Sequence, residues 1–120
     1  MSMDRDRRSE GLLPLRPVDF HILLSLTKGD RHGYGIIQDA RERGAAAPDI
    51  GTLYRALARM VDRGLIKAAD SRPAPDADDE RRNYYRMTDA GLRVAKAEAR
   101  RMDALTRAAR IGGLLEKEAK

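Results

Sequence analysis

The sequence contains no cysteine and no tryptophan, and it has only two histidines. The absence of cysteine excludes disulfides and thiolate chemistry, although it leaves the redox compartment open. No apolar run approaches the roughly 20 residues of a membrane-spanning helix. The charged start MSMDRDRRSE is not followed by the apolar segment of a signal peptide. These absences together predict a cytoplasmic protein.

The residues and spacings that catalysis usually requires are also missing. No nucleophile–base spacing and no phosphate-binding glycine loop is present, so we predict no enzymatic activity, no metal and no cofactor. His21 falls within an apolar segment, where a hydrogen-bonded core or boundary histidine is the expected role. The acidic run DADDE at 76–80 lacks the glycine and the distant glutamate of a calcium loop, and it is typical of a solvated loop tip.

Charge, by contrast, is abundant. Charged residues make up 36% of the 120 residues, and the net charge is +5. This length allows one domain with a modest core. The basic balance permits binding to nucleic acid or to an anionic membrane, but it does not establish either.

The clearest helix signal spans Asp49–Gly64, with Asp49 as the N-cap and Gly64 as the left-handed residue after the last turn. A helical wheel directs one apolar stripe toward the core, formed by Ile50, Leu53, Leu57, Met60 and Val61. The opposite face carries Gly51, Thr52, Arg55, Ala58, Arg59, Asp62 and Arg63. A major groove admits such a helix, and Arg and Thr can bond base edges or phosphates. For this segment alone, a solvated amphipathic helix is the alternative.

Further elements are predicted on both sides of this helix. The expected helices are Pro17–Lys28, Gly33–Arg43 and Thr88–Arg110, and the expected strands are Leu65–Ala69 and Asn83–Met87. The first helix is apolar almost all round and should be central, and a turn is expected at Gly29–His32. The second helix and the Asp49 helix form a helix-turn-helix, and the two strands form a wing around a long loop.

The last helix, with Thr88 as its N-cap, runs past the small core. Its apolar stripe consists of Leu92, Ala95, Ala99, Met102, Leu105 and Ala109. Pairing with a second copy of the chain would bury this stripe, and folding back onto its own domain is the alternative.

These elements predict a mainly α fold with a small β-hairpin, a winged helix-turn-helix followed by a long C-terminal dimerisation helix. We expect a flexible tail over 1–16, the DNA-binding domain over 17–87 with its wing at 65–87, the dimerisation helix over 88–111 and a frayed tail over 112–120. Leu12, Leu13 and Leu15 are too apolar for a free tail. They should dock on the rest of the protein, and a partner subunit is one candidate.

Three motifs, in this order, resemble the PadR family of bacterial transcriptional regulators. They are HGYGI at His32–Ile36, GTLYRAL at Gly51–Leu57 with the following Gly64-Leu65-Ile66, and YYRMTDAG at Tyr84–Gly91. The resemblance implies a homodimer that represses a nearby promoter. In some members a small molecule at the dimer interface releases the DNA.

Two departures from the family pattern affect these expectations. The family often has Pro where Ile50 stands, and a Gly-rich basic wing where this chain has Asp78–Glu80. No aromatic residue follows Tyr85, so a drug pocket that sandwiches its ligand between aromatic rings is not supported.

The predicted function is therefore that of a sequence-specific transcriptional regulator, a homodimeric repressor bound to a near-palindromic operator. Its partners would be double-stranded DNA, a second copy and a small-molecule effector of unknown identity. The predicted DNA contacts are Tyr34, Gly51, Thr52, Tyr54, Arg55, Arg59, Arg81 and Arg82. For Tyr34 and Tyr54, packing within the domain is an equal alternative. The alternative function, which the acidic loop favours, is a winged-helix protein-interaction module that does not contact DNA.

Overall fold

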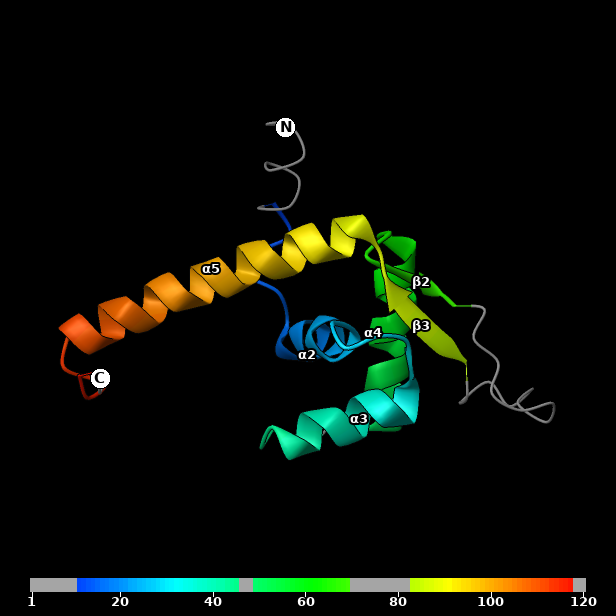
Figure 1. Cartoon of the computed structure of the whole chain (residues 1–120), viewed down its shortest axis with the longest axis horizontal. Helices are drawn as coiled ribbons and strands as arrows, with labels where there is room; N and C mark the ends of the chain where they lie inside the picture. Colours follow the sequence, from blue (N-terminus) through cyan, green and yellow to red (C-terminus); the bar gives the residue numbers. More distant parts are fainter. Residues whose placement is uncertain (1–10, 46–48, 70–82, 118–120) are drawn as a thin grey trace.

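The computed structural model describes residues 11–45, 49–69 and 83–117. In chain order these ranges form α2 (Pro17–Leu26), β1 (Arg31–His32), α3 (Gly33–Glu42), α4 (Ile50–Asp62), β2 (Ile66–Ala68), β3 (Tyr84–Met87) and α5 (Asp89–Ile111) (Figure 1). The helices begin and end within two residues of their predicted bounds. The mainly helical fold with a small antiparallel sheet is confirmed.

Helix α2 lies at the centre of the domain, between α3, α4 and α5 (Figure 1). Its Ile22 and Leu23 are completely buried. The apolar residues that surround them include Ile36, Leu53, Leu57, Met60, Ile66 and Val94. The predicted central position of this helix is therefore confirmed. However, α2 also buries two polar residues, Asp19 and Ser25, which the apolar pattern did not predict.

The sheet has the strand order β1-β3-β2, and β3 pairs antiparallel with both neighbours. The β2–β3 pair is the predicted wing hairpin. The predicted turn at Gly29–His32 is wrong in part, because Arg31 and His32 pair with Tyr85 and Tyr84 as a third strand. A two-residue strand has no alternation to detect in the sequence. It forms here because the tertiary fold brings a second edge of β3 alongside it.

Capping side chains hold the predicted helix starts in place. Asp49 Oδ1 accepts a hydrogen bond of 2.7 Å from the backbone N–H of Thr52 at the start of α4. Thr88 Oγ1 accepts one of 3.0 Å from the N–H of Gly91 at the start of α5. At the end of α4, Gly64 adopts φ +76°, and the N–H of Leu65 returns to the carbonyl of Met60 at 3.0 Å. This is the pattern of a Schellman motif, as the glycine predicted.

The segment before α2 docks on the domain, as predicted for Leu12, Leu13 and Leu15, so the predicted flexible tail does not extend to residue 16. Leu15 is 9% exposed and belongs to the core, and Leu12 and Leu13 pack against that core. The N–H of Leu15 donates a hydrogen bond of 3.1 Å to the carboxylate of Glu98 on α5. Arg101 also donates to Glu98, and this hydrogen bond lowers the pKa of the Glu98 carboxyl. Residues 11–16 thus dock on their own chain, while 1–10 lie outside the described residues.

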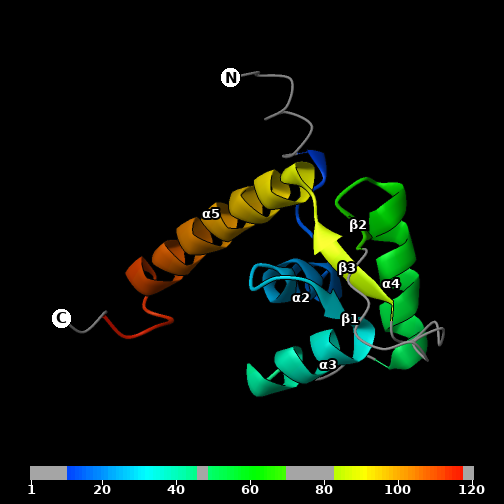
Figure 2. The ribbon, with the colours of Figure 1, turned by 45° about the vertical axis from the view of Figure 1, so that its right-hand side comes forward.

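Helix α5 starts against the body of the domain and extends beyond it (Figures 1 and 2). A Cβ atom on Gly91 would lie 2.1 Å from the carbonyl oxygen of Leu65, so only glycine permits this close approach. Further along, the predicted dimerisation stripe is interrupted: Leu92, at its start, is 39% exposed. Ala95 packs in the core of its own chain, so its assignment to a free face is wrong, whereas Leu105 is 60% exposed.

Candidate nucleic-acid interface

The start of α4 presents three of the predicted DNA-binding residues on the surface. Gly51 and Arg55 are exposed, and Thr52 is partly exposed. Arg55 Nη2 lies 3.3 Å from Thr52 Oγ1, so the two side chains lie together. Asp49 caps this end of the helix, and its hydrogen bond with the Thr52 backbone lowers the pKa of the Asp49 carboxyl. The first two turns of α4 therefore combine a hydrogen-bonding side chain, a cation and a glycine that leaves the backbone accessible.

The buried stripe of α4 is rotated relative to the helical-wheel prediction. Leu53, Leu57 and Met60 are buried as predicted, and Ala56 joins them. Ile50 and Val61, predicted to face the core, are 40% and 41% exposed. The prediction was wrong for these two residues because a wheel shows which residues share a side, but the neighbouring helices decide which part of that side they cover.

Arg59 also differs from its predicted place on the free outer face. Its guanidinium donates a hydrogen bond of 2.6 Å to Asp19 Oδ1 on α2, and the Arg59 side chain is 24% exposed. Asp19 itself is 2% exposed. The ion pair therefore fastens α4 to the central helix. The sequence signal that was missed is an acidic residue within an otherwise apolar helix.

The two predicted tyrosines have different environments. Tyr34, the second residue of α3, is 41% exposed. Tyr54 packs against the core, and a Cβ atom on Gly33 would lie 2.6 Å from its hydroxyl oxygen. Tyr54 therefore packs against Gly33, the first residue of α3. This contact favours packing within the domain over the predicted DNA contact. Tyr34 keeps an accessible ring beside this contact.

The three sequence motifs meet around the sheet. His32 caps α3, with Nδ1 accepting from the N–H of Gly35 at 2.9 Å. The His32 ring packs edge-on against Tyr84, with 5.3 Å between ring centroids. Thr88, in the third motif, donates a hydrogen bond of 2.6 Å to the carbonyl of Gly64 at the end of α4. The motif residues therefore set the relative positions of α3, α4 and the wing.

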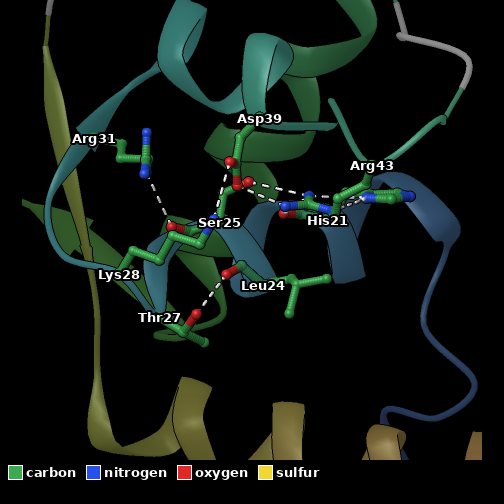
Figure 3. A network of polar contacts seen from close by, with 8 residues as sticks. All are labelled: His21, Leu24, Ser25, Thr27, Lys28, Arg31, Asp39 and Arg43. Atoms are coloured by element: carbon green, nitrogen blue, oxygen red, sulfur yellow. Dashed lines mark hydrogen bonds and ion pairs between the residues drawn. The ribbon is translucent and has the colours of Figure 1, made fainter. Parts of the chain in front are cut away.

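A polar network ties α2 to α3 (Figure 3). Arg43 donates to Asp39 at 2.5 Å, and its Nη2 lies 2.9 Å from His21 Nδ1 and 3.2 Å from Ser25 Oγ. His21 is thus hydrogen-bonded at the edge of the core, as predicted. Burial and the Arg43 charge both lower the pKa of His21.

Asp39 is the anionic centre of this network. Burial would raise the pKa of its carboxyl, but hydrogen bonds from Ser25, Arg43 and Lys28 lower it to about 2. The Asp39–Arg43 spacing of four residues is the signal that could have found this pair. Because the network joins the central helix to the first helix of the helix-turn-helix, it holds the scaffold on which α4 is displayed.

The wing is described only in part. Arg81 and Arg82, predicted to contact phosphates, lie outside the described residues, as does the acidic run at 76–80. On β3, Arg86 forms a bidentate ion pair with Asp30: Nε donates to Oδ1 at 3.0 Å, and Nη2 donates to Oδ2 at 2.8 Å. About half of the Arg86 side chain is exposed. This pair fixes the base of the wing against the segment that precedes β1.

These features define a winged helix-turn-helix protein. The second helix of the motif, α4, exposes its N-terminal end. The chain belongs to the PadR-like family of transcriptional regulators, whose family model matches residues 22–97. Regulators of this family bind DNA and are not enzymes, which agrees with the absence of catalytic spacings in the sequence.

Solved structures show the same relationship. A PadR family transcription regulator from hypervirulent Clostridium difficile R20291 is 30% identical, with a TM-score of 0.66 over 77% of this chain and 93% of that one. A transcriptional regulator from Clostridium thermocellum is 28% identical, with a TM-score of 0.65 over 97% and 99% of the two chains. A PadR family regulator from Eggerthella lenta DSM 2243 is 25% identical, with a TM-score of 0.63 over 93% and 88%. No curated protein matches the chain.

Two further properties, metal binding and membrane crossing, concern all the residues that the structure describes. Over these ranges no cluster of His, Cys, Asp and Glu has the composition to hold a metal ion. None of their helices combines the length and the apolar character needed to cross a membrane.

Proposed function

We propose that this protein is a homodimeric transcriptional repressor that binds a near-palindromic operator through the first two turns of α4. The observation that carries the proposal is the exposed group of Gly51, Thr52 and Arg55 at the start of the second helix of a helix-turn-helix. In this motif the N-terminal residues of the second helix contact base edges.

Each residue has a distinct role in this proposal. Arg55 and Thr52 contact base edges or adjacent phosphates, and Gly51 allows the backbone to come close. Tyr34 contacts the phosphate backbone at the start of α3, because a helix N-terminus favours an anion. Arg81 and Arg82 hold the backbone from the wing. Arg59, held by Asp19, positions α4 and does not contact a base.

The proposed dimer forms through the distal half of α5, residues 99–111 together with the segment that follows. Leu105, Ile111 and Leu114 are 60%, 89% and 81% exposed. Met102 and Ala109 line the same half of the helix and are partly exposed. Apolar side chains at this spacing are buried when two helices pair. Two copies would place their α4 helices on half-sites about one helical turn apart, roughly 34–36 Å.

The first experiment determines oligomeric state and binding mode together. We expect a dimer at micromolar concentration by light scattering, and a monomer when Leu105→Glu places a charge in the interface. The dimer should select a palindromic site from random DNA. Its affinity should fall steeply between 50 and 200 mM salt, because neutralised phosphates release counterions. A monomeric wild-type chain would contradict the dimer, and salt-independent binding would contradict the DNA mode.

The second experiment tests the α4 surface. Arg55→Ala should weaken binding to the selected site by about 1–3 kcal/mol and relax the preference at one base pair per half-site. Arg41→Ala is the matched control, because Arg41 is also exposed and lies in the last turn of α3. Equal effects of the two variants would assign Arg55 to general electrostatics. Loss of a protein partner without any effect on DNA would instead favour the interaction module.

Repression, control by an effector and a cytoplasmic location are further parts of the proposal, and the family resemblance supports the first two. Transcription from the gene's own upstream region, with and without the protein, tests the sign of regulation. Release of a preformed DNA complex by small molecules tests for an effector.

A further inference from the structure

Ile50 is an exposed aliphatic residue at the start of α4, the end of the helix that is proposed to meet DNA. It is the first residue of the helix, directly after the Asp49 cap, and its side chain is 40% exposed. In an amphipathic helix the apolar stripe faces the core. Here the core stripe is formed by Leu53, Ala56, Leu57 and Met60, and Ile50 lies outside it.

The neighbours of Ile50 determine what it would meet. It is followed by Gly51, Thr52 and, one turn on, Arg55, the residues proposed to enter the major groove. Tyr54, four residues on, lies on the same flank of the helix and is directed toward Gly33 at the start of α3. When α4 enters a groove by its N-terminus, its first residue approaches the base edges together with the first turn.

The chemistry of the groove then selects the contact. Among the groups that base pairs present in the major groove, the C5-methyl group of thymine is the apolar group that projects into the groove. An isoleucine side chain cannot donate or accept a hydrogen bond, so a cytosine amino group or a purine edge would be desolvated without compensation. A thymine methyl group, in contrast, gains from leaving water against an aliphatic surface.

We infer that Ile50 is a specificity-determining residue that selects thymine in each half-site by contact with its C5-methyl group. The inference rests on the proposed function, because it requires α4 to enter the major groove. It explains the exposure of an aliphatic side chain next to a cationic and hydroxylic surface. It also assigns a consequence to the sequence departure at this position, where the family often has proline.

The test begins with unmodified protein, so that folding is not in question. Each thymine of the selected operator is replaced in turn by deoxyuridine, which removes the methyl group and keeps base pairing. Burial of one methyl group corresponds to a change of about four-fold in affinity. We expect a loss of about four-fold at one thymine per half-site, about fifteen-fold when both are replaced, and little change at thymines outside the contact.

The protein variants then assign the effect to this side chain. Ile50→Ala should bind the thymine and deoxyuridine operators equally well, whereas all other substitutions in the operator keep their effects. Val61→Ala is the matched control, because Val61 is an equally exposed aliphatic residue, 41%, at the opposite end of α4. It should retain the full methyl sensitivity of the wild type.

The outcomes separate the two proposals. A salt-sensitive operator complex that tolerates deoxyuridine at every position would overturn the role of Ile50 and leave the DNA-binding function standing. Methyl sensitivity that persists in Ile50→Ala would also overturn it, because another residue would then make the contact. Failure to select any operator would overturn both.

Discussion

Replacing Asp19 with Asn removes the negative charge to which Arg59 is bonded and keeps the size of the side chain. In the wild type the Arg59 guanidinium lies 2.6 Å from Asp19 Oδ1, and the two side chains are 24% and 2% exposed. The Nε atom of Arg59 is buried and has no hydrogen-bond partner among the residues that the structure describes. The ion pair with Asp19 is therefore the main interaction that offsets the desolvation of the partly buried Arg59 guanidinium.

The burial of the pair sets the expected magnitude. Breaking a fully buried pair costs about 3–5 kcal/mol, and an exposed pair contributes about 0–1 kcal/mol. With one partner almost completely buried and the other three-quarters buried, we expect Asp19→Asn to lower the free energy of unfolding by about 2 kcal/mol. Since urea m-values of small proteins are about 1–3 kcal/mol per molar, the urea midpoint should fall by about 1 M.

A double-mutant cycle isolates the pair from other effects of each substitution. The variants are Asp19→Asn, Arg59→Met and the double substitution, unfolded in urea at one protein concentration because a dimer's stability depends on concentration. The double variant should lose less free energy of unfolding than the two single variants lose together, and the difference, the coupling energy, should be about 2 kcal/mol. A coupling near zero would refute the ion pair as a stabilising contact.

The same variants decide between the two roles of Arg59. If Arg59 positions α4, Asp19→Asn weakens DNA binding only through lost stability, and Arg59→Met leaves the base preference unchanged. If Arg59 contacts a base, Asp19→Asn releases it and tightens binding, and Arg59→Met alters the selected site without destabilising the protein. The second result would restore the prediction made from the helical wheel.

Two further predictions concern stability. Folding lowers the pKa values of His21 and Asp39, so the unfolded chain binds protons at these groups at a higher pH than the folded chain. The free energy of unfolding should therefore fall as pH drops below about 6.5 and again below about 4. Urea midpoints at several pH values check this: His21→Asn should remove the first decrease, and Asp39→Asn should reduce the second, to which Asp49 and Glu98 also contribute. A flat profile would contradict it. Gly91→Ala should cost about 1–3 kcal/mol or more, because its Cβ would lie 2.1 Å from the Leu65 carbonyl. Thermal melts check this against Gly112→Ala, whose Cβ would lie an ordinary 3.4 Å from the nearest carbonyl oxygen, and equal melting temperatures for the two variants would refute the close approach.

Much of the fold could be predicted because its determinants are local. Asp49 and Thr88 cap helices through hydrogen bonds to N–H groups three residues away. Gly64 ends α4 through bonds within a single turn. The surface group of Gly51, Thr52 and Arg55 follows from their spacing on one helix.

Other features could not be predicted, because their partners are distant in sequence. Arg59 meets Asp19 across 40 residues, and the N–H of Leu15 meets Glu98 across 83. The wheel placed Arg59 outside and Ile50 inside, and both placements depend on how closely α2 and α3 pack on α4. The third strand, β1, depends in the same way on the position of β3.

The order of helices and strands, their caps and the three family motifs could be read from the amino-acid pattern, because they follow from contacts within a few residues. Three other outcomes were set by tertiary packing: which polar groups are buried, which apolar side chains stay exposed and which residues of α5 contact the domain. Those outcomes depend on the packing of elements far apart in the chain, where a buried carboxylate requires a donor that no local pattern identifies.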